Sequence, residues 1–479
     1  MRIVEIQLHQ REGLTLRMHA TSRRGTFAVT ADGHGMTGRA GTALLAEAAD
    51  RLGLTGALSR LAGGCRSWVL HDPGKVLRDL IVTLADGGDA LRHTGVLAGQ
   101  PVLFGTVASP ATTNRTLVAV ADDASAVALL DAARKAARGV AWRNGAAPPV
   151  IAAALAGTRP DEPLCIDVDA TLITAHSDDK DGAGKTYKRT WGFHPLGAWL
   201  DRGDGLGEAL AATLRPGNAG ANTATDHIAV YDAAMDQLGV LPRAVDVLVR
   251  ADSAGATHDF VDHLRVTGAG FSVGFAITAA VRDAIRVLPD RAWTPAVRQD
   301  GQPRAGAAAA ELSDAVDLSG WPTGSRLIVR REPLHPGAQQ TIDDIDGARF
   351  TCFLTDQTEA DLAQLDARHR AHARVEDRIR GAKDTGARNL PCDTFARNAV
   401  WLQLVLAAQD LMTFMQTLTL DGTLRVAEPA TLRYQLLHVP ARITRSGRRT
   451  VLRIERTWPW ADALVTAFTR LRALPLPAT

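Results

Sequence analysis

Two aspartates alternate with apolar residues in the segment at 164–173, Leu-Cys-Ile-Asp-Val-Asp-Ala-Thr-Leu-Ile. The alternation predicts a β-strand that turns Asp167 and Asp169 to one face and apolar side chains to the other. Because an unpaired buried charge is costly, carboxylates in a half-buried strand need a cationic neighbour, commonly a metal ion. The segment therefore predicts one wall of a metal site; the alternative is an edge strand with a solvated face.

Two further acids stand where functional groups are expected. An apolar strand predicted at 245–251 ends at Asp252, and strand ends of this kind carry functional side chains in α/β sheets. In a long charged helix predicted at 360–383, Glu376 shares one stripe with basic residues. These are His369, His372, Arg380 and Lys383. The excess of bases predicts phosphates beside Glu376 and a metal ion in front of it; the alternative is an intramolecular ion pair.

Three other groups of basic residues are candidates for contact with phosphates. The first is a glycine-rich loop at 180–195, which lacks the full P-loop spacing and precedes a strand instead of a helix. The second is a helix capped by Ser109, which suits either DNA recognition or a plain surface helix. The third is an arginine hairpin near the C-terminus. The residues of these groups predicted to contact DNA are Lys185, Lys188, Arg189, Arg115, Arg445, Arg448 and Arg449.

The composition is that of an ordinary globular protein. The 479 residues are 46% hydrophobic and 22% charged, and the net charge of +2 is too small to indicate a nucleic-acid partner without the local clusters. Four separated cysteines without a C-x-x-C pair argue against a zinc module and a disulfide framework, which favours a reducing cytoplasm. The apolar segment at 399–420 contains Gln403, Gln409 and Asp410, so it predicts a buried helix and no membrane role.

The order of the predicted elements divides the chain into five segments. A mainly helical, DNA-binding region at 1–150 includes a small hairpin at 3–30. The first part of an α/β core follows at 160–278, a β-rich insertion at 279–350, and the second part of the core, with the Glu376 helix, at 351–420. A basic hairpin and a closing helix form the last segment, at 421–479.

Taken together, these residues resemble the DDE transposases, whose catalytic core is ribonuclease-H-like. The pattern is an acid in the first strand, an acid at the end of the fourth, and an acid on a helix after the fifth, with an inserted β-domain before that helix. Within this superfamily the sequence looks like insertion-sequence transposases of the thirteen-eighty group, relatives of the family-four insertion sequences. The matching segments are Asp-Ala-Thr at 169–171, Trp-Gly-Phe-His-Pro at 191–195, Arg-Ala-Asp-Ser-Ala-Gly at 250–255, and Glu376 with Lys383.

The resemblance implies an α/β fold with a ribonuclease-H-like mixed-sheet core, an inserted β-rich domain and a mainly helical N-terminal domain. It implies that Asp169, Asp252 and Glu376 are catalytic and hold two Mg²⁺ ions, for which Mn²⁺ can substitute. Asp167 is the second choice for the first acid, because Asp169 fits the family motif D-x-[ST]. The implied reaction cuts double-stranded DNA at terminal inverted repeats and joins the 3′ ends to target DNA, with a homodimer in the synaptic complex.

The sequence departs from the family pattern Y-x2-R-x3-E-x6-K at two positions. His369 stands where Tyr is usual and His372 where Arg is usual, whereas Glu376 and Lys383 match. These two positions usually contact the scissile phosphate and the flanking strand.

Two alternative functions fit parts of the sequence. Asp167-Val168-Asp169-Ala170-Thr171 resembles the D-x-D-x-T motif of haloacid-dehalogenase-like phosphatases, with Asp167 as nucleophile and Asp169 as acid/base. That interpretation leaves the basic helix around Glu376 unexplained. The other alternative is a transposase-derived DNA-binding protein whose acids are idle, and a cleavage assay separates it from an active enzyme.

Overall fold

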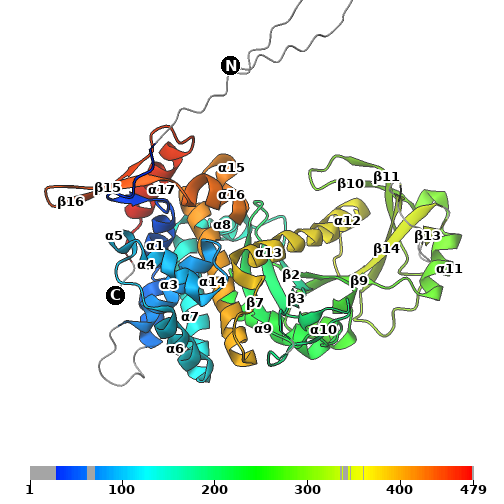
Figure 1. Ribbon diagram of the computed structural model, residues 1–479. Coiled ribbons are helices and arrows are strands. Elements are labelled where there is room, and N and C mark those ends of the chain that lie inside the picture. The colour runs from blue at the N-terminus through cyan, green and yellow to red at the C-terminus, as the bar shows by residue number, and fades with distance from the viewer. Residues whose placement is uncertain are drawn as a thin grey trace, which may run out of the picture.

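A bundle of helices lies at one end of the molecule, and the large sheet with its own covering helices lies at the other (Figure 1). The computed structural model describes residues 28–61, 71–177, 179–334, 337, 344–345, 347–359 and 361–476. The hairpin predicted at 3–30 lies almost entirely outside these residues. Helix α14 (Phe395–Thr419) lies between the two ends and packs against α3 on one side and β7 on the other.

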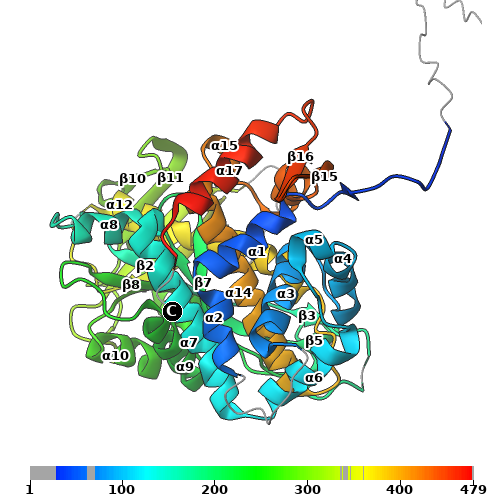
Figure 2. The ribbon, with the colours of Figure 1, turned by 90° about the vertical axis from the view of Figure 1, so that its left-hand side faces the viewer.

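The helical end consists of short and medium-length helices gathered around α14 (Figure 2). The apolar side chains of Trp401, Leu404 and Leu411 on α14 are buried in this core, as expected for a helix that is apolar on nearly all sides. In chain order the other helices are α1 (Thr42–Arg51), α2 (Leu54–Ser59), α3 (Pro73–Ala85), α4 (Gly95–Ala98), α5 (Pro101–Phe104), α6 (Pro110–Ala121), α7 (Ala124–Ala141) and α8 (Pro149–Leu155). In the described part of the chain, no helix combines the length and apolar character that crossing a membrane requires.

Helix α6 begins as its sequence predicts. Pro110 occupies the first turn, where its missing N–H costs nothing, and the Ser109 hydroxyl accepts a hydrogen bond of 3.3 Å from the backbone N–H of Thr112. We expect Ser109→Ala to lower the free energy of unfolding by about 1 kcal/mol, because the cap is lost. Urea denaturation measures the change, and Ser109→Asp, which keeps a capping oxygen, should stay close to the parent.

A single mixed sheet forms the other end of the molecule. Its strand order in the described residues is β10-β11-β12-β14-β9-β8-β2-β6-β7, with β13 paired to β14. Strands β2, β8 and β9 are mutually parallel, and the remaining pairs are antiparallel. The strands are β2 (Leu164–Ala170), β6 (Leu196–Asp201), β7 (Gly207–Thr213), β8 (Val247–Ala251), β9 (Gly270–Phe275), β10 (Thr294–Val297), β11 (Pro303–Glu311), β12 (Arg326–Pro333), β13 (Asp344–Ile345) and β14 (Ala348–Thr355).

The segment predicted as a β-rich insertion does not form a sheet of its own. Its strands continue the central sheet, because β14 pairs with β9 through Cys352 opposite Phe275. The segment also contains the helix α11 (Ala279–Val287), which the sequence analysis did not predict. Local alternation identifies strands but does not determine their neighbours, which is why this pairing was missed.

Helices cover both faces of the sheet. Helices α9 (Ala224–Leu238) and α10 (His258–Val266) pack on one face. Their buried apolar side chains form one core with Ile166 and Val168 of β2. Helices α12 (Leu362–Arg370) and α13 (Val375–Ala382) cover the other face (Figure 1). Asp167 lies on this second face, since it contacts His372 between the two helices. The alternation in β2 therefore separates an apolar core from an acidic face, as predicted.

The C-terminal part returns to the helical end. An arginine hairpin of β15 (Ala441–Ser446) and β16 (Arg449–Ile454) forms as predicted, and β1 (Met36–Thr37) adds to its edge. Gly447 in its turn has a φ of 59°, which glycine adopts without strain. The remaining elements are α15 (Gly422–Arg425), α16 (Pro429–Leu432) and α17 (Ala461–Ala473), and the short strands β3 (Ile173–Thr174), β4 (Gly184–Lys185) and β5 (Trp191–Phe193) form a small separate sheet.

A buried network of charges joins the two ends of the molecule. Arg138 of α7 is 2.9 Å from Glu208 of β7 and 2.6 Å from Asp410 of α14, and all three side chains are almost fully buried. Arg134 of α7 adds a contact of 3.2 Å to Asp410. The helical region and the sheet are therefore held together by paired charges as well as by apolar packing.

Candidate active site

Asp169 and Asp252 lie at the same edge of the sheet. Asp169 is the last residue but one of β2, and Asp252 directly follows β8. These strands are parallel neighbours, so their carboxyl ends meet. Asp252 is exposed and caps a 3-10 turn by accepting a bond of 2.9 Å from the N–H of Ala254. Asp169 is partly buried and accepts a bond of 2.7 Å from the N–H of Ala170.

Glu376 reaches this edge from the helices above the sheet. It is an exposed residue in the first turn of α13. Burial raises the pKa of the Asp169 carboxyl to about 6, and the negative charges of Asp252 and Glu376 add to the rise, while the positive charge of His372 opposes it. Asp252 and Glu376 therefore lie close enough to Asp169 to influence its charge.

Asp167 has a different environment from Asp169. Its two carboxylate oxygens lie 2.8 Å from Nε and Nη2 of Arg250, which stands opposite it in register on β8. His372 Nδ1 lies 3.0 Å from the same carboxylate. Burial opposes ionisation, but Arg250 and His372 outweigh it and hold the pKa of Asp167 below its usual value. Asp167 is thus a paired structural charge, and the second choice for a metal ligand is not favoured.

Arg250 is a central residue of the site that the sequence analysis did not single out. Its guanidinium is buried, pairs with Asp167 and, at 2.8 Å, with Asp201 of β6, and donates to the backbone carbonyl of Arg368 at 2.9 Å. Arg250 therefore links the strands β8, β2 and β6 to the C-terminal end of α12. An arginine within an otherwise apolar strand was the available signal, since such a charge needs a buried partner.

The prediction of one continuous charged helix at 360–383 is wrong. A 3-10 turn at Ala371–Arg374 separates α12 from α13, and a kink follows at Lys383–Ala387. His372, Glu376 and Lys383 nevertheless all lie near Asp169, whereas His369 packs against Phe353. The turn brings His372 down to Asp167 and leaves Glu376 exposed.

His369 does not lie where the prediction of a DNA contact requires. Its ring is stacked on Phe353, with centroids 4.3 Å apart, and Nδ1 is 2.9 Å from the Ser272 hydroxyl. Burial, assisted by the positive charges of His372, Arg250 and Arg330, lowers its pKa to about 3. A neutral, packed imidazole is poorly suited to a phosphate contact, so we correct this assignment. His372, also predicted to contact DNA, instead faces Asp167.

Two predicted lysines lie beside the acids. Burial lowers the pKa of Lys383, the nearby charges of Lys188 and Arg388 lower it further, and Asp169 opposes the change. Lys188 belongs to the predicted glycine-rich loop, in which Thr186 and Thr190 are joined by hydroxyls 2.8 Å apart. The loop therefore brings positive charge to the acidic edge. Lys185 is exposed on β4, and Arg189 has a left-handed backbone with a φ of 62°.

The other predicted basic residues are exposed, and Arg380 lies one turn beyond Glu376 on α13. Arg380 of α13 is engaged by Glu428 at 2.8 Å and by Asp377 at 2.5 Å. Arg115 donates to Thr112 within α6 at 2.9 Å. Arg445, Arg448 and Arg449 lie on the hairpin, which both views place at the helical end and not beside β2 (Figures 1 and 2).

The described residues contain no preformed group of three or more His, Cys, Asp or Glu side chains that could hold a metal ion. The acids at the edge of the sheet are near one another without closing around a common point. Their carboxylate oxygens are nevertheless the donor type that Mg²⁺ and Mn²⁺ prefer.

A mixed sheet flanked by helices, with acids at one edge, is consistent with the fold of DDE transposases. A family model described as transposase DDE domain group 1 matches residues 20–476. The chain therefore belongs to this family, and its function is that of a transposase. A search of curated proteins gives no match.

Proposed function

We propose that this transposase cuts DNA at the terminal inverted repeats of an insertion sequence and joins the freed 3′ ends to target DNA, with Asp169, Asp252 and Glu376 as its catalytic acids. The observation that carries the proposal is the position of Asp169 and Asp252 at the adjacent carboxyl ends of two parallel strands, with Glu376 close enough to act on the charge of Asp169. Acids that are far apart in the sequence rarely accumulate unpaired charge at one place without a function.

The strand order supports a ribonuclease-H-like core. The part of the sheet ordered β7-β6-β2-β8-β9 has its first acid on the central strand β2 and its second after the parallel neighbour β8. Glu376 follows on a helix after β9 and the inserted strands. This is the order of acids that the resemblance to insertion-sequence transposases of the thirteen-eighty group implies.

Asp169, Asp252 and Glu376 would hold two Mg²⁺ ions, or Mn²⁺ in their place. When bound, such ions activate an attacking oxygen and stabilise the leaving oxygen of a phosphodiester. The chain's own groups would position the DNA: Lys188 and Lys383 provide positive charge for the phosphates next to Asp169. Arg250 keeps the strands of the acids in register without contacting DNA. A homodimer that synapses two ends is part of the proposal.

Cleavage assays with single substitutions test this assignment. We expect Asp169→Asn, Asp252→Asn and Glu376→Gln each to lower Mg²⁺-dependent cleavage of DNA at the element's ends by at least ~100-fold, because residues that merely support metal ligands are already worth about 10–100-fold. Asp236→Asn, on the exposed acid that pairs with Lys135, is the matched control and should cleave like the parent. Undiminished cleavage by one of the three variants would remove that residue from the proposed site.

The same experiment separates the alternatives. A phosphatase of the haloacid-dehalogenase type requires Asp167 as a free nucleophile, whereas both oxygens of Asp167 are engaged by Arg250. An idle DNA-binding protein would bind DNA but show no metal-dependent cleavage in the parent. Neither alternative is favoured by a feature of the structure.

A further inference from the structure

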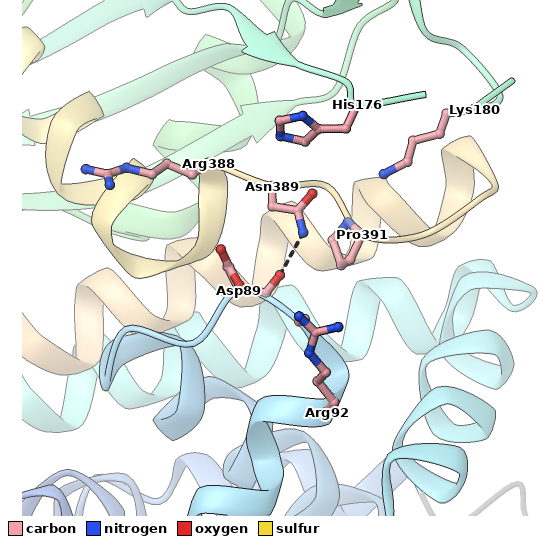
Figure 3. Close-up of a pocket in the computed structure, with 8 residues that line it drawn as sticks. Asp89, Arg92, His176, Lys180, Arg388, Asn389 and Pro391 are labelled. Atoms are coloured by element: carbon pink, nitrogen blue, oxygen red, sulfur yellow. Dashed lines mark hydrogen bonds between the residues drawn. The ribbon is translucent and has the colours of Figure 1, made fainter. Parts of the chain in front are cut away.

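A polar cavity lies between the helical region and the segments that follow β3 and α13 (Figure 3). Its volume is about 650 Å³, which is within the range of ligand-binding pockets. Three segments far apart in the sequence line it: the turn before α4, the segment after β3, and the segment after the kink at Lys383–Ala387. The lining residues are Asp89, Ala90, Arg92, His176, Lys180, Arg388, Asn389 and Pro391.

Cations outnumber anions in this cavity. Arg92 is exposed, and within the described chain its side chain has no recorded ion pair or hydrogen bond. Lys180 donates to the backbone carbonyl of Leu390 and keeps further donors. The one lining acid is Asp89, whose backbone N–H donates to Nδ1 of His93 at 3.1 Å. The cavity therefore offers guanidinium and ammonium donors to an anion.

The two walls are fixed relative to each other. The side-chain amide of Asn389 donates to the backbone carbonyl of Asp89 at 3.1 Å, which joins the segment after the kink to the helical region (Figure 3). In Figure 3, Arg92 approaches from one side of this bond, whereas His176 and Lys180 lie on the other. An anion in the cavity would thus contact both regions of the protein at once.

One side of the cavity follows the Glu376 helix along the chain. Arg388 is a lining residue, and it directly follows the kink at Lys383–Ala387, which continues from the helix that carries Glu376. Arg388 is 68% exposed and pairs with Asp384 at 2.6 Å, so it keeps free donors. Arg388 therefore brings positive charge to the side of the cavity that follows the Glu376 helix along the chain.

We infer that this cavity binds backbone phosphates of the DNA strand as it leaves the acidic edge, with Arg92 and Arg388 as the phosphate contacts. The inference rests on the proposed DNA-cutting function and adds residues to it that the family pattern does not name. An extended polyanion fits these observations because the cationic groups come from three separate segments and two of them are exposed arginines, Arg92 and Arg388. The helical region thereby binds the same DNA strand that the catalytic acids cut in the proposed function.

Salt-dependent DNA binding tests the inference. The variants are Arg92→Gln, Arg388→Gln and the double variant, and the probe is a fluorescein-labelled duplex of about 40 base pairs and arbitrary sequence, at several NaCl concentrations. Each lost phosphate contact should reduce the slope of log K against log[NaCl] by about 0.9 and the double loss by about 1.8, with weaker binding throughout. Arg92→Lys, which keeps the charge, should retain most of the slope.

Two controls keep the result interpretable. Arg286→Gln removes an exposed arginine of α11, far from the cavity, and should leave the slope unchanged. Unfolding midpoints should match the parent in all variants, because both cavity arginines are exposed. A double variant that binds with the parent's slope and affinity overturns the inference.

The outcome is distinguishable from failure of the proposed function. If Asp169→Asn abolishes cleavage while the double cavity variant binds like the parent, only the cavity assignment fails. If the cavity variants lose slope while Asp169→Asn still cleaves, the cavity stands as a DNA contact and the catalytic assignment fails. A parent protein that does not bind the duplex contradicts both.

Discussion

Replacing Asp169 with Asn is expected to stabilise the protein at neutral pH while removing its cleavage activity. The pKa of this carboxyl is raised to about 6 in the folded protein, from an ordinary value of 3.8. When folding raises the pKa of an acid, the ionised form of that acid lowers the stability of the folded state. Each pKa unit corresponds to about 1.4 kcal/mol of unfolding free energy. We therefore expect the free energy of unfolding of Asp169→Asn to exceed that of the parent by about 2–3 kcal/mol at pH 8.

The difference in unfolding free energy between Asp169→Asn and the parent should depend on pH. Below pH 3.8 the carboxyl is protonated in both the folded and the unfolded chain, so the parent carries no penalty. Between 3.8 and about 6 the unfolded chain loses its proton first, and the stability of the parent falls as the pH rises. Urea denaturation at pH 8 and at lower pH should show an advantage of the variant that shrinks toward acid.

Two comparisons make this test specific. Asp236→Asn changes an exposed acid, so its unfolding free energy should stay within about 1 kcal/mol of the parent at every pH. Added Mg²⁺ should raise the unfolding midpoint of the parent more than that of Asp169→Asn, because a ligand of the folded state stabilises it. A variant that is less stable than the parent at pH 8 would show that Asp169 is a favourable structural charge.

Replacing Arg250 with Met is expected to destabilise the protein more than any other single change considered. Arg250 is 1% exposed and pairs with the buried carboxylates of Asp167 and Asp201. Its removal leaves His372 as the remaining partner of Asp167 within the described part of the chain, in a site away from water. Removing one partner of a buried pair costs about 3–5 kcal/mol, so we expect a loss of that size in chemical denaturation.

A double-mutant cycle measures the coupling between Asp167 and Arg250. Asp167→Asn combined with Arg250→Met removes the buried carboxylate charge together with its partner, and the double variant should lose less stability than the sum of the single variants. Arg286→Met, on an exposed arginine, is the matched control and should change stability by less than about 1 kcal/mol. Strict additivity of the two single changes would contradict a direct coupling between Asp167 and Arg250.

Local sequence signals predicted the individual elements well. The alternation at 164–170 predicted β2 and its two faces, Ser109 and Pro110 predicted the start of α6, and Ser446-Gly447 predicted the turn of the hairpin. In each case the responsible physics acts between residues that are near in sequence: side-chain alternation, a capping hydroxyl and a glycine with positive φ.

Contacts between distant segments could not be predicted in this way. The 3-10 turn at Ala371–Arg374 contains neither Gly nor Pro to mark it, and it is accompanied by the contact of His372 with Asp167. The pairing of Arg250 with Asp167 depends on the register of two strands some eighty residues apart. The cavity around Arg92 joins three segments, so no single stretch of sequence reveals it.

The buried network of Arg138, Glu208 and Asp410 limits how this transposase can move. Separating the helical bundle from the sheet would leave these charges without their partners. An unpaired charge inside a protein is strongly unfavourable. We therefore expect the two parts to move together and not as modules on a hinge. In the proposed function, any repositioning of a DNA end between cutting and joining would then come from the DNA itself and from surface loops, which move across a fixed platform.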